Sequence, residues 1–157
     1  MVTSLGPTRL LEMFEVLAEL EAMCGRLAAR RMSDAERKAL NEAHAACEQA
    51  SAQADTDDYF YSNERFHSLI YNGSHNGFLA EQAMQLHRRL RPYRRLQLRV
   101  RDRMNVSFSE HESIVQAIMN GDGDAVSQAL RTHVVVQGER FGDLMASLSE
   151  LETEVRI

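Results

Sequence analysis

The stretch "NERFHSLIYNGSHN", residues 63–76, decides how the chain folds and raises the question of what it binds. Phe66 and Ile70 stand one helical turn apart, which predicts an amphipathic helix, and the Asn-Gly-Ser run after them predicts a turn. His67 lies within the apolar stretch and Asn63 lies four residues before it, so both side chains share one face of that helix. A single His at such a position is more often a core residue bonded to a backbone carbonyl than a ligand.

Helix start and stop signals divide the rest of the chain into segments of helical periodicity. "SDAE" at 33–36 is a capping box, "DTDD" at 55–58 supplies an acidic N-cap and first turn, and "GDGD" at 121–124 joins a stop to a new N-cap. We therefore expect helices at about residues 8–31, 34–53, 56–72, 78–103, 107–120 and 124–147, with a continuation over 149–155 allowed by the pattern. Pro92 predicts a kink or break in the fourth. No alternation typical of strands occurs, so the predicted fold is all-α, an antiparallel bundle of about six helices.

Length and composition indicate one helical domain. Of 157 residues, 44% are hydrophobic and 26% charged, and we expect a lead-in over 1–7, the domain over 8–148 and a C-terminal tail over 149–157. The net charge of -5 argues against nucleic-acid binding by this domain, although arginines crowd between Arg88 and Arg103. No apolar run approaches the roughly 18 residues of a membrane span. Two isolated cysteines and no visible signal peptide complete the prediction of a cytoplasmic protein.

Two further histidines resemble His67 in their setting. His111 precedes Ile114 and Val115 by one helical turn, and His133 lies among apolar residues of the last predicted helix. Three imidazoles on inward faces would converge in the bundle, and neutral imidazoles with an amide oxygen suit a divalent transition metal such as zinc or nickel. The pattern leaves two interpretations open, one metal site or three separate core histidines. The remaining histidines, interpreted as surface or structural residues, are His44, His75 and His87.

Four stretches give the chain a resemblance to a known family. They are "FEVLAELEAMCGRLAARR", "NERFHSLIYNGSHNGFL", "SFSEHESIVQAIMNGDGDAV" and "ALRTHVVVQGERF". On them the chain, from about Leu10 to Leu148, resembles the C-terminal effector-binding domain of FadR-type GntR transcriptional regulators, the FCD domain. The resemblance implies an all-α antiparallel bundle that is usually dimeric.

The resemblance also implies a divalent metal in the centre of the bundle. The ligands carried over to this sequence are Asn63, His67, His111 and His133. Many relatives have Asp at the position of Asn63, and Asn is a neutral and weaker donor. In the family a small organic acid binds beside the metal and pairs with an Arg, whose planar fork matches a carboxylate. The candidate effector-binding residues are Arg91, Arg94 and Arg95. Some relatives carry an Arg in the first helix near Leu17, and this chain does not.

Full-length members of the family carry an N-terminal winged-helix DNA-binding domain. Only a few residues precede the first predicted helix, so we expect that domain to be absent and this chain to be a truncated or stand-alone sensing domain. The predicted function is sensing and dimerisation. We also predict a homodimer. In it, a carboxylate effector binds at the metal and allosterically controls DNA binding by an attached winged-helix domain.

Two other functions stay open from the residues alone. A three-His site with a free position can activate water in a metal-dependent hydrolase. The acidic neighbours of the proposed ligands, Glu64 and Glu112, point elsewhere on their helices, so no general base is in place and we expect no enzyme. A purely structural helical interaction module predicts instead that the three histidines are buried separately.

Overall fold

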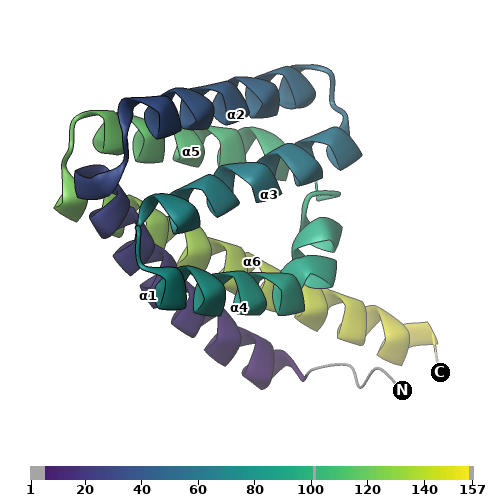
Figure 1. Ribbon diagram of the computed structural model, residues 1–157. Helices are drawn as coiled ribbons and strands as arrows, with labels where there is room; N and C mark the ends of the chain where they lie inside the picture. The colour runs from purple at the N-terminus through teal and green to yellow at the C-terminus, as the bar shows by residue number, and fades with distance from the viewer. Residues whose placement is uncertain (1–5, 101, 156–157) are drawn as a thin grey trace.

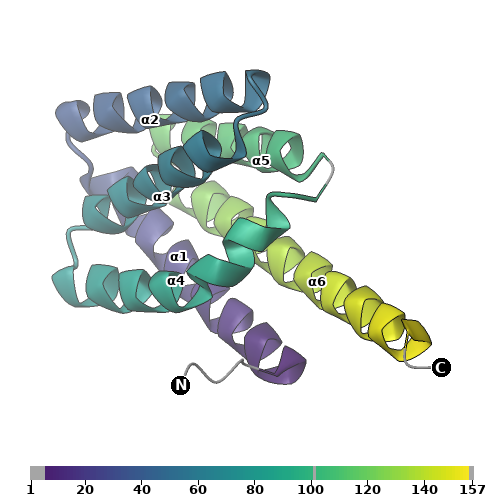
Figure 2. The same ribbon diagram turned by 90° about the vertical axis from the view of Figure 1, so that its right-hand side faces the viewer.

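Six α-helices make up the part of the chain that the computed structural model describes, residues 6–100 and 102–155. They are α1 (Pro7–Arg31), α2 (Asp34–Ala52), α3 (Thr56–Gly73), α4 (Gly77–Gln97), α5 (Arg103–Met119) and α6 (Gly123–Val155). Figures 1 and 2 show them packed as a bundle, which confirms the all-α class. Most of the predicted lead-in, residues 1–5, and the end of the predicted tail, residues 156–157, lie outside the described residues. The continuation over 149–155 is part of α6.

Helix caps form where the sequence predicted them. The Ser33 hydroxyl accepts a hydrogen bond from the Glu36 N–H at 3.1 Å, and the Glu36 carboxylate accepts one from the Ser33 N–H at 3.1 Å. The Asp55 carboxylate accepts a bond from the Asp58 N–H at 3.0 Å and so caps α3. After α5, Gly121 takes a left-handed conformation with φ of 66°, which suits a residue without Cβ. Each side-chain cap stabilises its helix by about 1 kcal/mol.

The boundary between the fourth and fifth helices differs from the sequence prediction. α4 passes through Pro92 but ends at Gln97, and α5 begins at Arg103 rather than at Ser107. The chain reverses before α5 with Asp102 at a φ of 62°, a conformation that costs a non-glycine residue energy. In both views the C-terminal end of α4 bends towards α5 (Figures 1 and 2). Arginine and leucine favour helix. The sequence pattern therefore predicted one helix up to residue 103 and missed the turn between α4 and α5.

The most extensive packing in the bundle joins α1 to α6. Gly25 of α1 makes this close approach possible, because a Cβ there would lie 2.3 Å from Leu130 Cδ1 and 2.5 Å from Val126 Cγ1. Gly138 of α6 does the same from the other side, since its Cβ would lie 2.8 Å from Phe14 Cβ. At these points the backbone of one helix therefore lies directly against side chains of the other.

The interior is not purely apolar. Ionisable side chains are buried in it, namely Glu21, His44, His67, His87, Arg94, Arg103, His111 and His133. Burying such groups is costly unless they are paired or bind something, so their positions point to the functional part of the molecule. Across the described residues, no helix has the length and apolar character needed to traverse a bilayer.

Candidate metal centre

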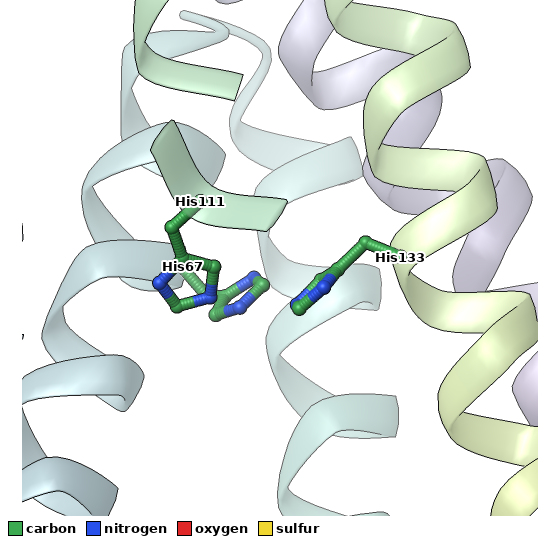
Figure 3. Close-up of side chains that lie close together, drawn as sticks. All are labelled: His67, His111 and His133. Atoms are coloured by element: carbon green, nitrogen blue, oxygen red, sulfur yellow. The ribbon is translucent and has the colours of Figure 1, made fainter. Parts of the chain in front are cut away.

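Three imidazoles from three helices meet inside the bundle. His67 of α3, His111 of α5 and His133 of α6 have no exposed surface. One potential ligand nitrogen of each ring lies within 4.8 Å of those of the other two. Figure 3 shows the three rings gathered at one point between their helices. The structure thus brings together the three histidines that the sequence singled out.

Each of these histidines reaches the interior because it belongs to the apolar face of its helix. Phe66 and Ile70, which flank His67 along α3, are fully buried, as is Ile114, one turn after His111 on α5. The ring of His111 stacks on that of Phe66 with centroids 4.3 Å apart. The helical period that predicted the core therefore also positions the imidazoles.

Several polar atoms at this cluster lack a hydrogen bond. Among the described residues, Nε2 of His67, both ring nitrogens of His111 and Oδ1 of Asn63 are buried without a hydrogen-bond partner. A buried polar atom left unpaired costs roughly 1–3 kcal/mol, so several together are unfavourable unless something binds there. Imidazole nitrogens and an amide oxygen are donors that a divalent transition metal accepts, so the residues fit such an ion. Core histidines bonded separately to carbonyl groups would not leave these atoms unpaired.

Two carboxylates approach the outer nitrogens of the cluster. Glu21 Oε1 of α1 lies 2.9 Å from His67 Nδ1, and Glu110 Oε1 of α5 lies 3.2 Å from His133 Nδ1. Histidines that bind metals usually donate their other N–H to a carboxylate, which fixes the tautomer and the ring direction. Because Glu21 lies against Nδ1 of His67, Nε2 is the nitrogen of that ring which a metal would take.

Burial holds the imidazoles in the form that binds metals. It lowers the pKa of His67, lowers the pKa of His111 well below its usual range, and lowers the pKa of His133 to about 4. These rings are therefore neutral at pH 7, as metal ligation requires. Burial alone would raise the pKa of Glu21, but the adjacent His67 and Arg94 hold that pKa below its usual range. Glu21 is thus an ionised acceptor in the interior.

A chain of buried polar contacts runs from Glu21 to α4. The Tyr71 hydroxyl donates to Glu21, and its oxygen lies 3.2 Å from His87 Nδ1. Arg94 Nη1 donates to the same His87 nitrogen at 2.6 Å. Its second terminal nitrogen, Nη2, is buried with no hydrogen-bond partner among the described residues. Arg94 therefore places a cation near the histidines with donor capacity to spare.

The other two candidate effector-binding arginines lie at the surface. Arg91 makes two hydrogen bonds to the Glu64 carboxylate, and Arg95 Nη2 lies 2.9 Å from Asp57 Oδ1. Both side chains are more than 40% exposed, whereas Arg94 is 5% exposed. Of the three, only Arg94 is brought into the interior near the cluster.

Sequence reasoning missed several residues around the cluster. They are Glu21, Tyr71, His87 and Glu110. Glu21 could have been found from the sequence. It lies one turn after Leu17 on the apolar face of the first helix, where a charged residue is unusual. Tyr71 and His67 likewise share a helical face. His87 is buried in this network, while the other two histidines pair elsewhere, His44 with Glu112 and His75 with Glu36.

The chain is similar to known proteins over most of its length. Residues 12–135 match the family model described as the FCD domain. No curated protein matches the chain significantly in sequence. Among solved structures, Escherichia coli McbR/YncC superposes with a TM-score of 0.82 at 20% identity, over 93% of this chain and 69% of that one. A Streptococcus agalactiae GntR protein superposes with a TM-score of 0.72 at 20% identity, over 85% of this chain and 60% of that one. At such identities these two structures show the fold.

Proposed function

Because the chain belongs to the FCD domain family, we propose that it is the effector-sensing and dimerisation domain of a GntR-type transcriptional regulator of the FadR subfamily. The observation that carries the proposal is the cluster of His67, His111 and His133, which joins three helices at one buried point. A site that ties three helices together is well placed to report a bound ligand to the whole bundle.

The cluster holds a divalent transition metal, zinc or nickel, with Asn63 as a further ligand. The support lies in the unpaired His67, His111 and Asn63 atoms and in the carboxylates behind His67 and His133. A bound ion would supply a Lewis-acid position for a carboxylate oxygen of the effector. The chain's own residues orient the rings and exclude water from them.

The effector is a small carboxylate that pairs with Arg94. The buried guanidinium keeps an unused N–H group, and its Nη1 donates to a neutral imidazole nitrogen rather than to a carboxylate. A carboxylate would supply the missing negative charge and accept two parallel bonds from the planar fork. Arg91 and Arg95 already have carboxylate partners at the surface, which makes them weaker candidates.

Effector binding acts on DNA through an attached winged-helix domain in a homodimer located in the cytoplasm. A ligand can shift an equilibrium between two dimer arrangements only by binding one of them more tightly. The effector bridges Arg94 of α4 to the ligands on α3, α5 and α6, so an arrangement that brings these helices closer is favoured. Catalysis forms no part of the proposal: Glu64 and Glu112, the acidic neighbours of the proposed ligands in sequence, pair with Arg91 and His44.

Metal analysis of the purified chain tests the first step. We expect about one zinc or nickel ion per chain, and strongly reduced metal in His67→Ala, His111→Ala and His133→Ala. The matched control is His75→Ala, which removes a half-exposed imidazole paired with Glu36 and leaves the metal content unchanged. A wild-type chain that carries no metal, and takes up none on incubation with either ion, contradicts the proposal.

A thermal-shift screen of small carboxylates tests the second step. Ligands that bind the native state raise Tm by mass action. We expect at least one carboxylate to raise Tm, an effect lost on adding chelator and lost in Arg94→Gln. Turnover of esters or phosphoesters that depends on the metal would favour the hydrolase alternative instead.

A further inference from the structure

Two adjoining hollows lie where α4 ends and α5 begins. The inner cavity, of about 10 Å³, is lined by Phe60, Asn63, Arg94, Gln97, Arg103 and Ser107 among others. The outer cleft, of about 330 Å³, is lined by Gln97, Val100, Arg103, Arg140, Asp143 and Leu144 among others. Gln97 and Arg103 border both hollows, so they form the neck between the protein surface and the proposed metal ligand Asn63.

Two buried guanidiniums face this path. Arg94 is 5% exposed and Arg103 is 2% exposed, and Nη2 of each has no hydrogen-bond partner among the described residues. Arg103 uses Nη1 to donate to Glu110 Oε1 at 3.0 Å, and Arg140 adds a further positive charge in the outer cleft. Unpaired buried donors on two cations are costly, and an anion that reaches both would relieve that cost.

Arg103 is also connected to the metal centre through α5. Glu110 Oε1, which accepts the bond from Arg103, lies 3.2 Å from His133 Nδ1. A group bound at Arg103 and a group bound near Asn63 and Arg94 would therefore contact one continuous polar network. Such a network favours a single ligand that spans both positions.

We propose that the effector carries two acidic groups, the first bound at Arg94 and the metal centre and the second bound by Arg103 at the neck of the outer cleft. The proposal rests on the proposed function for its first acidic group and adds a binding site for the second. That second group is a carboxylate or a phosphate-like group, because a guanidinium recognises both through the same paired N–H bonds.

The sizes of the hollows agree with this division. The inner cavity has room for about one water molecule, which the first acidic group replaces as the surrounding side chains move apart. The outer cleft reaches the size of small-molecule sites, roughly 300–1,000 Å³, and so accommodates the rest of the ligand. Arg103 stands at the border, where the second acidic group of a short ligand would lie.

Isothermal titration calorimetry on the metal-loaded chain tests the proposal with matched probes. Propionate carries one acidic group, succinate adds a second carboxylate, and 3-phosphonopropionate adds a phosphonate. Malonate and glutarate vary the spacing. We expect at least one two-acid probe to bind about 10- to 100-fold more tightly than propionate, as expected for one additional charge-assisted pair. Tighter binding of succinate would identify the second acidic group as a carboxylate, and tighter binding of 3-phosphonopropionate would identify it as phosphate-like.

Substitutions at the neck separate binding from structure. Arg103→Gln should remove the 10- to 100-fold advantage of the two-acid probe over propionate, measured as the ratio of the two affinities in the same variant. Arg103→Lys, which keeps the charge without the planar fork, should retain part of the advantage. Arg99→Gln removes an exposed arginine outside both hollows and should change nothing.

Each alternative outcome overturns a defined part of the proposal. If propionate binds and no two-acid probe exceeds it, the second site is wrong and the proposed function stands. If Arg103→Gln loses propionate or metal as well, Arg103 acts through Glu110 and His133, and the second site is again wrong. If no probe binds and the chain takes up no metal, the proposed function itself fails.

Discussion

Glu21 is the residue whose position changes the chemistry of the interior most. It is fully buried on α1, lies 2.9 Å from His67 Nδ1 and accepts a hydrogen bond from Tyr71. A carboxylate at this place aligns the His67 ring and increases its basicity as a ligand. It also adds a negative charge to the interior that partly balances Arg94. The first helix thus contributes to the proposed metal centre without supplying a ligand.

Replacing Glu21 by Gln should weaken metal binding. The amide keeps the size of the side chain but loses the charge that orients and polarises His67, and loss of such a partner typically costs 10- to 100-fold in metal affinity. Competition with a metal-sensitive chelator measures the change. Glu15→Gln, on the exposed face of the same helix, serves as the control. Equal affinities in wild type and Glu21→Gln would show that Glu21 does not orient the ligand.

Acidification should destabilise the metal-free protein. The pKa of His133 is about 4 in the folded state and near 6.5 when unfolded, so the unfolded chain binds more protons between these values. Stability from this residue is complete above pH 6.5 and is lost progressively as the pH falls towards 4. The difference amounts to about 3 kcal/mol at 1.36 kcal/mol per pKa unit.

Urea denaturation of the metal-free chain at pH 7, 6 and 5 measures this dependence. The buried His67 and His111 have lowered pKa values too, so they act in the same direction. His133→Asn should flatten the dependence. A stability that rises from pH 7 to pH 5 would contradict the assignment of neutral, buried imidazoles.

At the scale of elements, local signals define where most helices of the bundle begin, but the end of α4 and the start of α5 depend on how these helices pack. The capping box at Ser33 and the cap at Asp55 form as the sequence indicates, because a side chain and a backbone amide within one turn suffice. The end of α4 at Gln97 is different, because helix-favouring residues continue beyond it. Only the return of α5 into the bundle requires the chain to turn there.

The pairing of α1 with α6 leads to a prediction about Gly25. Gly25→Ala should destabilise the protein by up to about 2 kcal/mol, because the overpacking cost of roughly 1–3 kcal/mol is only partly offset by a gain of about 1 kcal/mol in helix propensity. The added methyl group would overlap Leu130 and Val126. Denaturant unfolding measures the change. Gly77→Ala, where the added Cβ meets nothing within 4 Å, is the matched control and should be neutral or stabilising.

At the scale of the whole molecule, the histidine cluster ties together helices that are distant in the sequence. His67, His111 and His133 belong to α3, α5 and α6, and Glu21 extends the network to α1. Arg94 extends it to α4 through His87 and Tyr71. Binding at the proposed centre would therefore act on nearly the whole bundle, which is the property that a sensing domain needs.

Metal binding should stabilise the entire domain. At a free metal concentration one hundred times Kd, the gain is about 2.7 kcal/mol. A domain of this size shifts by about 2–4 °C per kcal/mol, so Tm should rise by roughly 5–10 °C. Calorimetry of the zinc- or nickel-loaded chain, with and without chelator, measures the shift. His111→Ala should abolish it, and an equal shift in that variant would place the ion elsewhere.

The sequence by itself determined the number of helices, most of their starts, and the faces that carry His67, His111 and His133. These features result from the helical period and from caps, which depend on residues close together along the chain. Tertiary structure alone decided which polar residues share the interior with them. Glu21 and Arg94 approach the centre because α1 and α4 pack there, and Arg91 and Arg95 remain outside although they lie beside Arg94 in sequence. Contacts between helices depend on how they pack in space, and neighbouring sequence positions do not specify that packing.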